Sequence, residues 1–176
     1  MAWYLGLVAA VVVARFVELG VASRHLAWAR ERGGIETGAG HYPFMVALHS
    51  ALLVGCAVEV VVADRPFLPW LGWPMLALLV AAHALRWWCI RTLGPQWNTR
   101  VIRVPGQPLV TGGPYRWLRH PNYVAVVAEG VALPLVHSAW VTALVFTLLN
   151  AWLLRVRIGV ENGALAGDQP GDLARQ

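Results

Sequence analysis

The residues best suited to chemistry lie in one short stretch, GGPYRWLRHPNY, at residues 112–123. Its imidazole, carboxamide and two phenols belong to His120, Asn122, Tyr115 and Tyr123. Pro121 suits the first turn of an α-helix, where its missing N–H removes no hydrogen bond. We therefore predict a helix that begins near Asn122, and its N-terminus would attract an anion such as a carboxylate or a phosphate. The alternative is an interfacial anchor, because Arg, Tyr and Trp favour the headgroup zone of a membrane.

A second polar pair, Arg157 and Glu161, lies in the sequence RIGVE. The spacing of four puts both side chains on one face of a helix, where a surface ion pair stabilises by only about 0.2–0.5 kcal/mol. Their position directly after the last apolar segment favours a functional role over a surface pair.

Several ionisable residues lie inside apolar segments, where they are costly and usually face the protein interior or a cavity. Arg15 and Glu18 share a helix face, and we expect a structural internal pair. Glu129 either reaches a cavity or holds a neighbouring helix, and the role of Glu59 stays open. We expect Arg86, near the end of an apolar segment, to extend to the membrane interface.

The sequence gives little support for metal binding or redox chemistry. His41 and His49 are eight residues apart with no carboxylate nearby, so an interfacial or pocket-lining role is favoured over metal binding. Cys56 and Cys89 lie in apolar runs without a CxxC motif, as small buried hydrophobic residues do. No GxGxxG, P-loop, GxSxG or HExxH motif is present, which argues against a soluble methyltransferase or dehydrogenase.

The elements that must position these residues follow from composition. The chain is 58% hydrophobic and only 13% charged, against about 25% charged in soluble domains. Five apolar segments are predicted, at about residues 2–22, 43–63, 68–89, 123–136 and 138–154. A membrane helix needs about 20 residues, so the last two are short and are predicted to form a helical hairpin, with one kinked element as the alternative. The predicted fold is an all-α integral membrane protein with about five transmembrane helices.

Arginine placement predicts the orientation. All fourteen cations are arginine, and they flank the apolar segments. Five spans place nearly all of them on one side, which the positive-inside rule assigns to the cytoplasm, with the N-terminus outside. Membrane orientation thus explains the positive charge, so we expect a lipid bilayer and no nucleic acid as a partner.

The polar connection at 91–122 is too long to be an ordinary loop. Such loops are usually functional or disordered, and its aromatic residues argue against disorder. We predict one domain over residues 1–166, with three membrane helices in 1–89 and a catalytic half in 90–166. A frayed tail is expected over 167–176.

The segment PLVTGGPYRWLRHPNYVAVVAEG, residues 108–130, resembles the signature of the isoprenylcysteine carboxyl methyltransferase (ICMT) family. That signature reads Leu-Val-x-x-Gly-x-Tyr-x-x-x-Arg-His-Pro-x-Tyr. A second element of the family, Arg-x-x-x-Glu after the last membrane helix, is matched by Arg157 and Glu161. The resemblance covers about residues 90–165.

The resemblance implies an integral membrane enzyme that transfers a methyl group from S-adenosylmethionine to a lipophilic acceptor. Its cytosolic cofactor pocket would lie between the 91–122 loop and the end of the last helix. The implied cofactor contacts are Gln107, Pro108, Leu109, Val110, Tyr115, His120, Pro121, Asn122, Tyr123 and Glu161. Arg157 and Glu161 would be catalytic, Arg157 would also face the acceptor, and no metal is expected.

The acceptor is less defined by the resemblance. The repeated glutamates of the eukaryotic prenyl-cysteine enzymes are reduced here to Glu161-Asn162. The N-terminal half, with ARFVEL and GGIETGAGHYPFMVALH, is similar to a bacterial branch that includes O-methyltransferases of alkylresorcinols and alkylpyrones. A long-chain phenol or pyrone in a bacterial inner membrane is therefore favoured over a prenyl-cysteine carboxylate. The alternatives are an NADPH-dependent sterol-type reductase, which shares a similar RHPNY region, and a non-enzymatic membrane scaffold.

Overall fold

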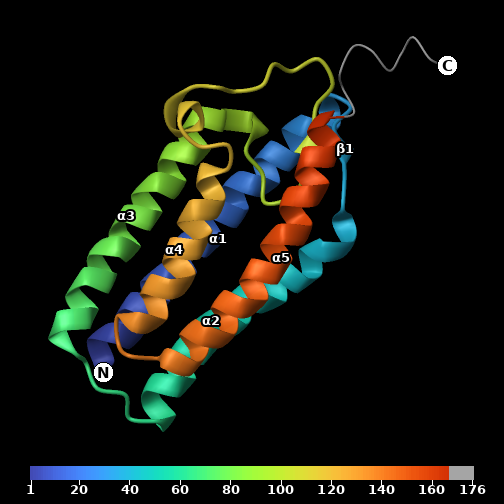
Figure 1. Cartoon of the computed structure of the whole chain (residues 1–176). Helices are drawn as coiled ribbons and strands as arrows, with labels where there is room; N and C mark the ends of the chain where they lie inside the picture. The colour runs from blue at the N-terminus through green and yellow to red at the C-terminus, as the bar shows by residue number, and fades with distance from the viewer. Residues whose placement is uncertain (167–176) are drawn as a thin grey trace.

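The computed structural model describes residues 1–166, and five α-helices run along most of its length (Figure 1). They are α1 (Ala2–Glu31), α2 (Tyr42–Val62), α3 (Pro69–Leu93), α4 (Pro121–Leu135) and α5 (Trp140–Ala166). Short elements join them, namely the 3₁₀ turns η1 (Ala39–His41), η2 (Gly94–Gln96) and η3 (Gly113–Arg116) and the strands β1 (Ile35–Glu36) and β2 (Ile102–Arg103). The predicted helical class is confirmed for these residues. Residues 167–176, where we expect a frayed tail, lie outside the described part.

Four helical segments of the described chain are long and apolar enough to cross a membrane, Ala2–Glu31, Ala39–Val62, Pro69–Gln96 and Trp140–Gly163. Large apolar side chains cover their outer surfaces, as Phe16, Val62 and Trp70 illustrate at 69%, 79% and 71% exposed. Such extensive apolar exposure suits lipid rather than water. α4, with 15 residues, is about 22 Å long and falls short of the ~30 Å hydrocarbon core. Much of its surface is buried by its neighbours.

α4 and α5 form a hairpin whose turn spans residues 136–139, as the sequence predicts. Ser138 adopts a positive φ of 59° in this turn. The first turn of α5 is capped by Glu59 from α2, which accepts the backbone N–H groups of Val141 and Thr142 at 3.1 and 2.7 Å. A carboxylate at a helix N-terminus satisfies N–H groups that have no partner within the helix. Glu59 therefore has a structural role, and it joins α2 to α5.

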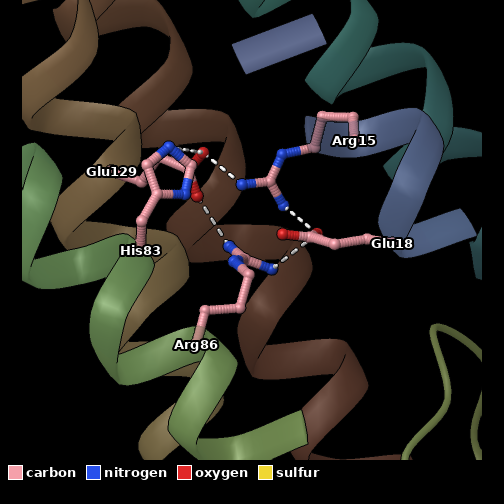
Figure 2. A network of polar contacts seen from close by, with 5 residues as sticks. All are labelled: Arg15, Glu18, His83, Arg86 and Glu129. Carbon is pink, nitrogen blue, oxygen red and sulfur yellow. Dashed lines mark hydrogen bonds and ion pairs between the residues drawn. The ribbon is translucent and has the colours of Figure 1, made fainter. Parts of the chain in front are cut away.

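A ring of four charged side chains, the charged ring, joins α1, α3 and α4 inside the bundle (Figure 2). Arg15 binds both Glu18 and Glu129, which confirms the expected internal pair. Arg86 binds Glu129 at 2.7 Å and lies 3.9 Å from Glu18. His83 adds an Nε2 that is 3.7 Å from Glu129. Because each carboxylate faces both guanidiniums, the four charges compensate one another in apolar surroundings.

Arg86 corrects one expectation. The sequence places it near the end of an apolar segment, which predicts a side chain that extends to the interface. The side chain is instead 7% exposed and turned inward. Glu18 and Glu129 lie across from it at the same depth and supply its counter-charges, and the sequence of α3 alone cannot reveal them.

Local structure in the polar regions also differs from the prediction. α1 continues to Glu31 and α5 to Ala166. Both helices thus extend into polar sequence beyond the apolar segments, which end at about residues 22 and 154. The 91–122 connection contains η2, β2 and η3. β2 pairs antiparallel with β1, with Ile35 opposite Arg103. Strands of two residues have no alternating pattern that a sequence could display.

Candidate functional site

A cavity of about 460 Å³ lies among the end of α1, the connection between α3 and α4, the start of α4 and the end of α5. This volume falls within the range of about 300–1,000 Å³ that is typical of small-molecule sites. Of the residues predicted to contact a cofactor, those that line it are Gln107, Leu109, Val110, Tyr115, His120, Asn122, Tyr123 and Glu161. Arg157 lines it as well. The connection covers the end of the bundle opposite the start of α1 (Figure 1).

Two of the predicted contact residues, Pro108 and Pro121, are not part of the cavity wall. Pro121 is buried at the first position of α4, which confirms the predicted helix start. Pro108 is exposed, and its carbonyl accepts a hydrogen bond from Gln96 Nε2 at 3.3 Å. Both prolines thus shape the backbone beside residues that do line the cavity.

Tyr123 connects the two residues predicted to be catalytic. Its hydroxyl donates a hydrogen bond to Glu161 and accepts one from Arg157 Nε at 2.9 Å. The His120 ring stacks on Tyr123 with centroids 5.3 Å apart, and His120 Nδ1 is 3.8 Å from Glu161 Oε2. Arg157 and Glu161 therefore meet through a phenol of α4, a geometry unlike the surface ion pair of the alternative interpretation.

Arg157 is 5% exposed, and both of its partners are neutral. They are the Tyr123 hydroxyl and Met45 Sδ, which lies 2.9 Å from Arg157 Nη1. Among the described residues, no carboxylate lies within 4.0 Å of the guanidinium. A buried charge normally has a counter-ion, so Arg157 retains hydrogen-bonding capacity for an anionic oxygen.

Two other polar atoms of the cavity wall are buried and have no hydrogen-bond partner within residues 1–166. They are Asn122 Oδ1, an acceptor, and Trp97 Nε1, a donor. Buried polar groups are nearly always hydrogen-bonded. This acceptor and this donor are therefore unsatisfied groups of residues that line the cavity.

Tyr115 lies where η3 meets α3. Burial, followed by the nearby Cys89 thiol, raises the pKa of Tyr115 above its ordinary value, so the phenol stays protonated. Gly113 adopts a φ of +54°, and a Cβ there would lie 2.5 Å from Thr92 Oγ1 on α3. Only glycine combines this backbone conformation with so close an approach. Gly113, the second glycine of the GGPY sequence, thus sets the position of Tyr115 at the cavity.

The connection between α1 and α2 also borders the site, which the sequence did not predict. Glu36 accepts a hydrogen bond from Arg100 Nη1 at 2.7 Å, and Arg100 stacks over the Tyr42 ring at 4.3 Å. The hydrogen bond to Glu36 raises the pKa of Arg100. Arg100 lines the cavity, so an N-terminal segment holds part of its rim. Because Glu36 and Arg100 lie far apart in the sequence, spacing gives no signal of their contact.

His49 has the pocket-lining position that the sequence favoured. Together with Arg15 and Glu129, it lines a small second cavity of about 20 Å³ inside the bundle. Within the described residues, no group of three or more His, Cys, Asp or Glu side chains is arranged to hold a metal ion.

Comparisons with known proteins agree with the sequence motif. Residues 75–167, more than half of the chain, match the model of the isoprenylcysteine carboxyl methyltransferase (ICMT) family. The chain is 37% identical over 166 residues to the uncharacterized protein YpbQ of Bacillus subtilis (strain 168), which covers 94% of this chain and 96% of the relative. It is 26% identical over 161 residues to an uncharacterized protein of Haemophilus influenzae (strain ATCC 51907 / DSM 11121 / KW20 / Rd), covering 90% and 92% of the two chains. With its long apolar helices and this family match, the chain belongs to the ICMT family of integral membrane methyltransferases.

Proposed function

We propose that this protein transfers a methyl group from S-adenosylmethionine to an oxygen atom of a lipophilic acceptor in the membrane. Family membership supports methyl transfer. The observation that carries the finer proposal is Arg157, a buried guanidinium with only neutral partners at the wall of a ligand-sized cavity. Such a group stabilises an oxygen that is negative or becomes negative during reaction.

The residues of the cavity fit S-adenosylmethionine. Glu161 and Asn122 Oδ1 offer acceptors for its amino group and hydroxyls, and Trp97 Nε1 offers a donor for a ring nitrogen. The N-terminus of α4, with Arg119 beside it, suits its carboxylate. Aromatic faces such as Tyr123 favour a cationic sulfonium. When bound, this cofactor supplies an electrophilic methyl group.

Catalysis would rest on orientation and charge. In-line transfer gains most of its rate from holding two reactants in the correct geometry. Tyr123 fixes the plane of the Arg157 guanidinium through Nε, which leaves a terminal nitrogen for the acceptor oxygen. Glu161 in turn fixes the hydroxyl of Tyr123.

We also propose that the cavity faces the cytoplasm and that the acceptor is a long-chain phenol or pyrone. Arginines of α1, α3 and α5 lie in the parts of these helices that border the cavity, as the positive-inside rule requires of a cytoplasmic face, namely Arg24, Arg30, Arg91 and Arg155. The similarity of the N-terminal half to bacterial O-methyltransferases of alkylresorcinols and alkylpyrones favours a phenol or pyrone over a prenyl-cysteine carboxylate.

The test combines binding and turnover in detergent micelles. Calorimetry with S-adenosylmethionine measures binding, and label from its methyl group is followed into a bacterial lipid extract. We expect binding and labelling for the wild type. Arg157→Gln should keep binding and lose about 10²–10³-fold in rate, as the loss of one oxyanion donor does. Arg155→Gln, an exposed neighbour, serves as the matched control.

Three results contradict the proposal. A folded protein that binds no S-adenosylmethionine refutes it. Oxidation of NADPH without methyl transfer supports the reductase alternative. Equal activity of the wild type and Arg157→Gln would show that Arg157 has no role in the reaction.

A further inference from the structure

Two residues of α2 and the residue that caps its N-terminus face α5. We call these three residues the α2 stripe. They are His41, Met45 and His49, which recur every four residues and therefore share one helix face. Met45 Sδ is 2.9 Å from Arg157 Nη1. The His49 ring lies 5.4 Å from the ring of Phe146. The stripe thus follows α5 from the Arg157 turn toward the middle of the bundle.

His41 lies at the cavity end of this stripe. Gly38 has a φ of +68°, and a Cβ there would lie 2.6 Å from Val160 Cγ1 and 2.7 Å from His41 Cε1. The His41 ring and Val160 therefore border the same small space. α2 and α5 are antiparallel. Met45 near the start of α2 contacts Arg157 toward the end of α5, and Glu59 near the end of α2 contacts Thr142 at the start of α5. His41 accordingly lies beside the turn of α5 that follows Arg157.

The Arg157 guanidinium then has two distinct sides. Tyr123 and Glu161 lie on the side that lines the cavity. Met45 and His41 belong to the other side, and neither is among the described residues that line the cavity. A methyl donor held in the cavity and an acceptor held along the α2 stripe would meet at this guanidinium.

An imidazole at this position indicates whether the acceptor oxygen carries a proton when it binds. A neutral imidazole, with an ordinary pKa of about 6.5, is a suitable base at neutral pH. A carboxylate acceptor is already ionised and needs no base. A phenol, with a pKa of about 10, arrives with its proton.

We propose that His41 is the base that takes this proton from a phenol or enol acceptor, and that Met45 forms the wall against the acceptor ring. The inference rests on the proposed methyl transfer. The acceptor O–H bond breaks and its proton moves to the neutral imidazole, while the oxygen–methyl bond forms. The methyl–sulfur bond of the sulfonium breaks, and its electron pair stays on a neutral thioether. The imidazolium then returns its proton to solvent. Met45 suits the wall because a thioether chain is flexible and polarisable.

The test compares two acceptors with the same long alkyl chain, a phenol and a more acidic nitrophenol, in detergent micelles. His41→Gln should bind S-adenosylmethionine as the wild type does. It should methylate the phenol about 10²–10⁴-fold more slowly, the usual effect of losing a general base, and the nitrophenol less than tenfold more slowly. Added imidazole should partly rescue His41→Ala on the phenol. Ser50→Ala, exposed on α2, is the control.

A second readout requires no turnover. Nitrophenol absorbance reports its ionisation when it is bound without a methyl donor, and His41→Gln should shift the ionisation midpoint to higher pH. The charged groups around His41 are Arg157 on α5 and, beyond Tyr42, the Glu36–Arg100 pair, all of which this variant retains. Equal rate losses on both acceptors, or an unchanged midpoint, overturn the role of His41. Absence of S-adenosylmethionine binding by the wild type instead refutes the proposed function, while the absorbance titration still decides on His41.

Discussion

Glu129→Gln is the most informative test of the charged ring. Glu129 is 7% exposed at its side chain and accepts contacts from both Arg15 and Arg86. The substitution preserves the shape of the side chain and removes its charge. Glu18 then remains as the carboxylate of the ring, and it faces two guanidiniums, that of Arg86, which is buried, and that of Arg15, which is 19% exposed at its side chain. The ring changes from neutral to a net charge of about +1 in surroundings that solvate charge poorly.

The expected cost follows from these contacts. Removal of one partner from a buried ion pair costs about 3–5 kcal/mol, because the remaining charge is left without compensation. In a chain of this size, 1 kcal/mol corresponds to about 2–4 °C in Tm. Glu129→Gln should therefore lower Tm by about 6–20 °C. The double variant Arg86→Gln/Glu129→Gln leaves the neutral Arg15–Glu18 pair, so it should be more stable than Glu129→Gln alone.

The assay is thermal unfolding in detergent micelles, followed by the circular dichroism of the helices. Glu31→Gln is the matched control, because Glu31 is 74% exposed at its side chain and lies 3.6 Å from Arg32. An exposed pair of this kind contributes at most about 1 kcal/mol. A Glu129→Gln protein as stable as Glu31→Gln would refute the reasoning. So would a double variant whose loss equals the sum of its two single losses, because the residues would then act independently.

Three further predictions concern other contacts of the fold. Glu59→Gln weakens the cap on the first turn of α5 and should lower the free energy of unfolding by about 1–3 kcal/mol, measured in the same melts; no loss contradicts the cap. Gly130→Ala places a Cβ against the ring of Phe146 and should cost about 1–3 kcal/mol, whereas Gly20→Ala, with open space around it, should be neutral or stabilising. Glu36→Gln loosens the rim of the cavity at Arg100 and should raise the Kd for S-adenosylmethionine about two- to fivefold, or about 0.4–1 kcal/mol, as measured by calorimetry; an unchanged Kd would show that this part of the rim does not contribute to the ligand site.

The elements that the sequence predicts well are those with strong local signals. Long apolar segments define the membrane helices, and Pro121 marks the start of α4 because its ring suits a first turn. The GGPY sequence indicates a turn, which the structure forms as η3 at Gly113–Arg116. Each of these features depends on residues that are close in the chain. Their local character is the reason that the sequence reveals them.

The contacts that the sequence does not predict join residues far apart in the chain. Arg86 was expected at the interface because its own helix gives no sign of Glu18 and Glu129 opposite it. The Tyr123 contacts to Arg157 and Glu161 require α4 and α5 to fold back on one another. Glu36 and Arg100 meet through strands too short to display a pattern. In such cases the sequence indicates candidate residues and leaves their partners open.

The two halves of the chain contribute differently to the site, and this difference bears on specificity. The family match begins at residue 75 and includes the cavity wall from Leu93 onward. Met45, which contacts Arg157, and Glu36, which holds Arg100, both precede that match. If the cavity holds the methyl donor, most of its recognition belongs to the matched half, to which the N-terminal half adds Trp28, Ala29 and the Glu36–Arg100 contact. Met45 and His41 of the N-terminal half then face the acceptor. Proteins that share the C-terminal motif can then differ in acceptor through α2 alone. Exchange of residues 38–49 between this chain and a relative, with Tyr42 retained because it stacks on the cavity-lining Arg100, should transfer acceptor preference while S-adenosylmethionine affinity stays constant. Transfer of both properties together would contradict this division.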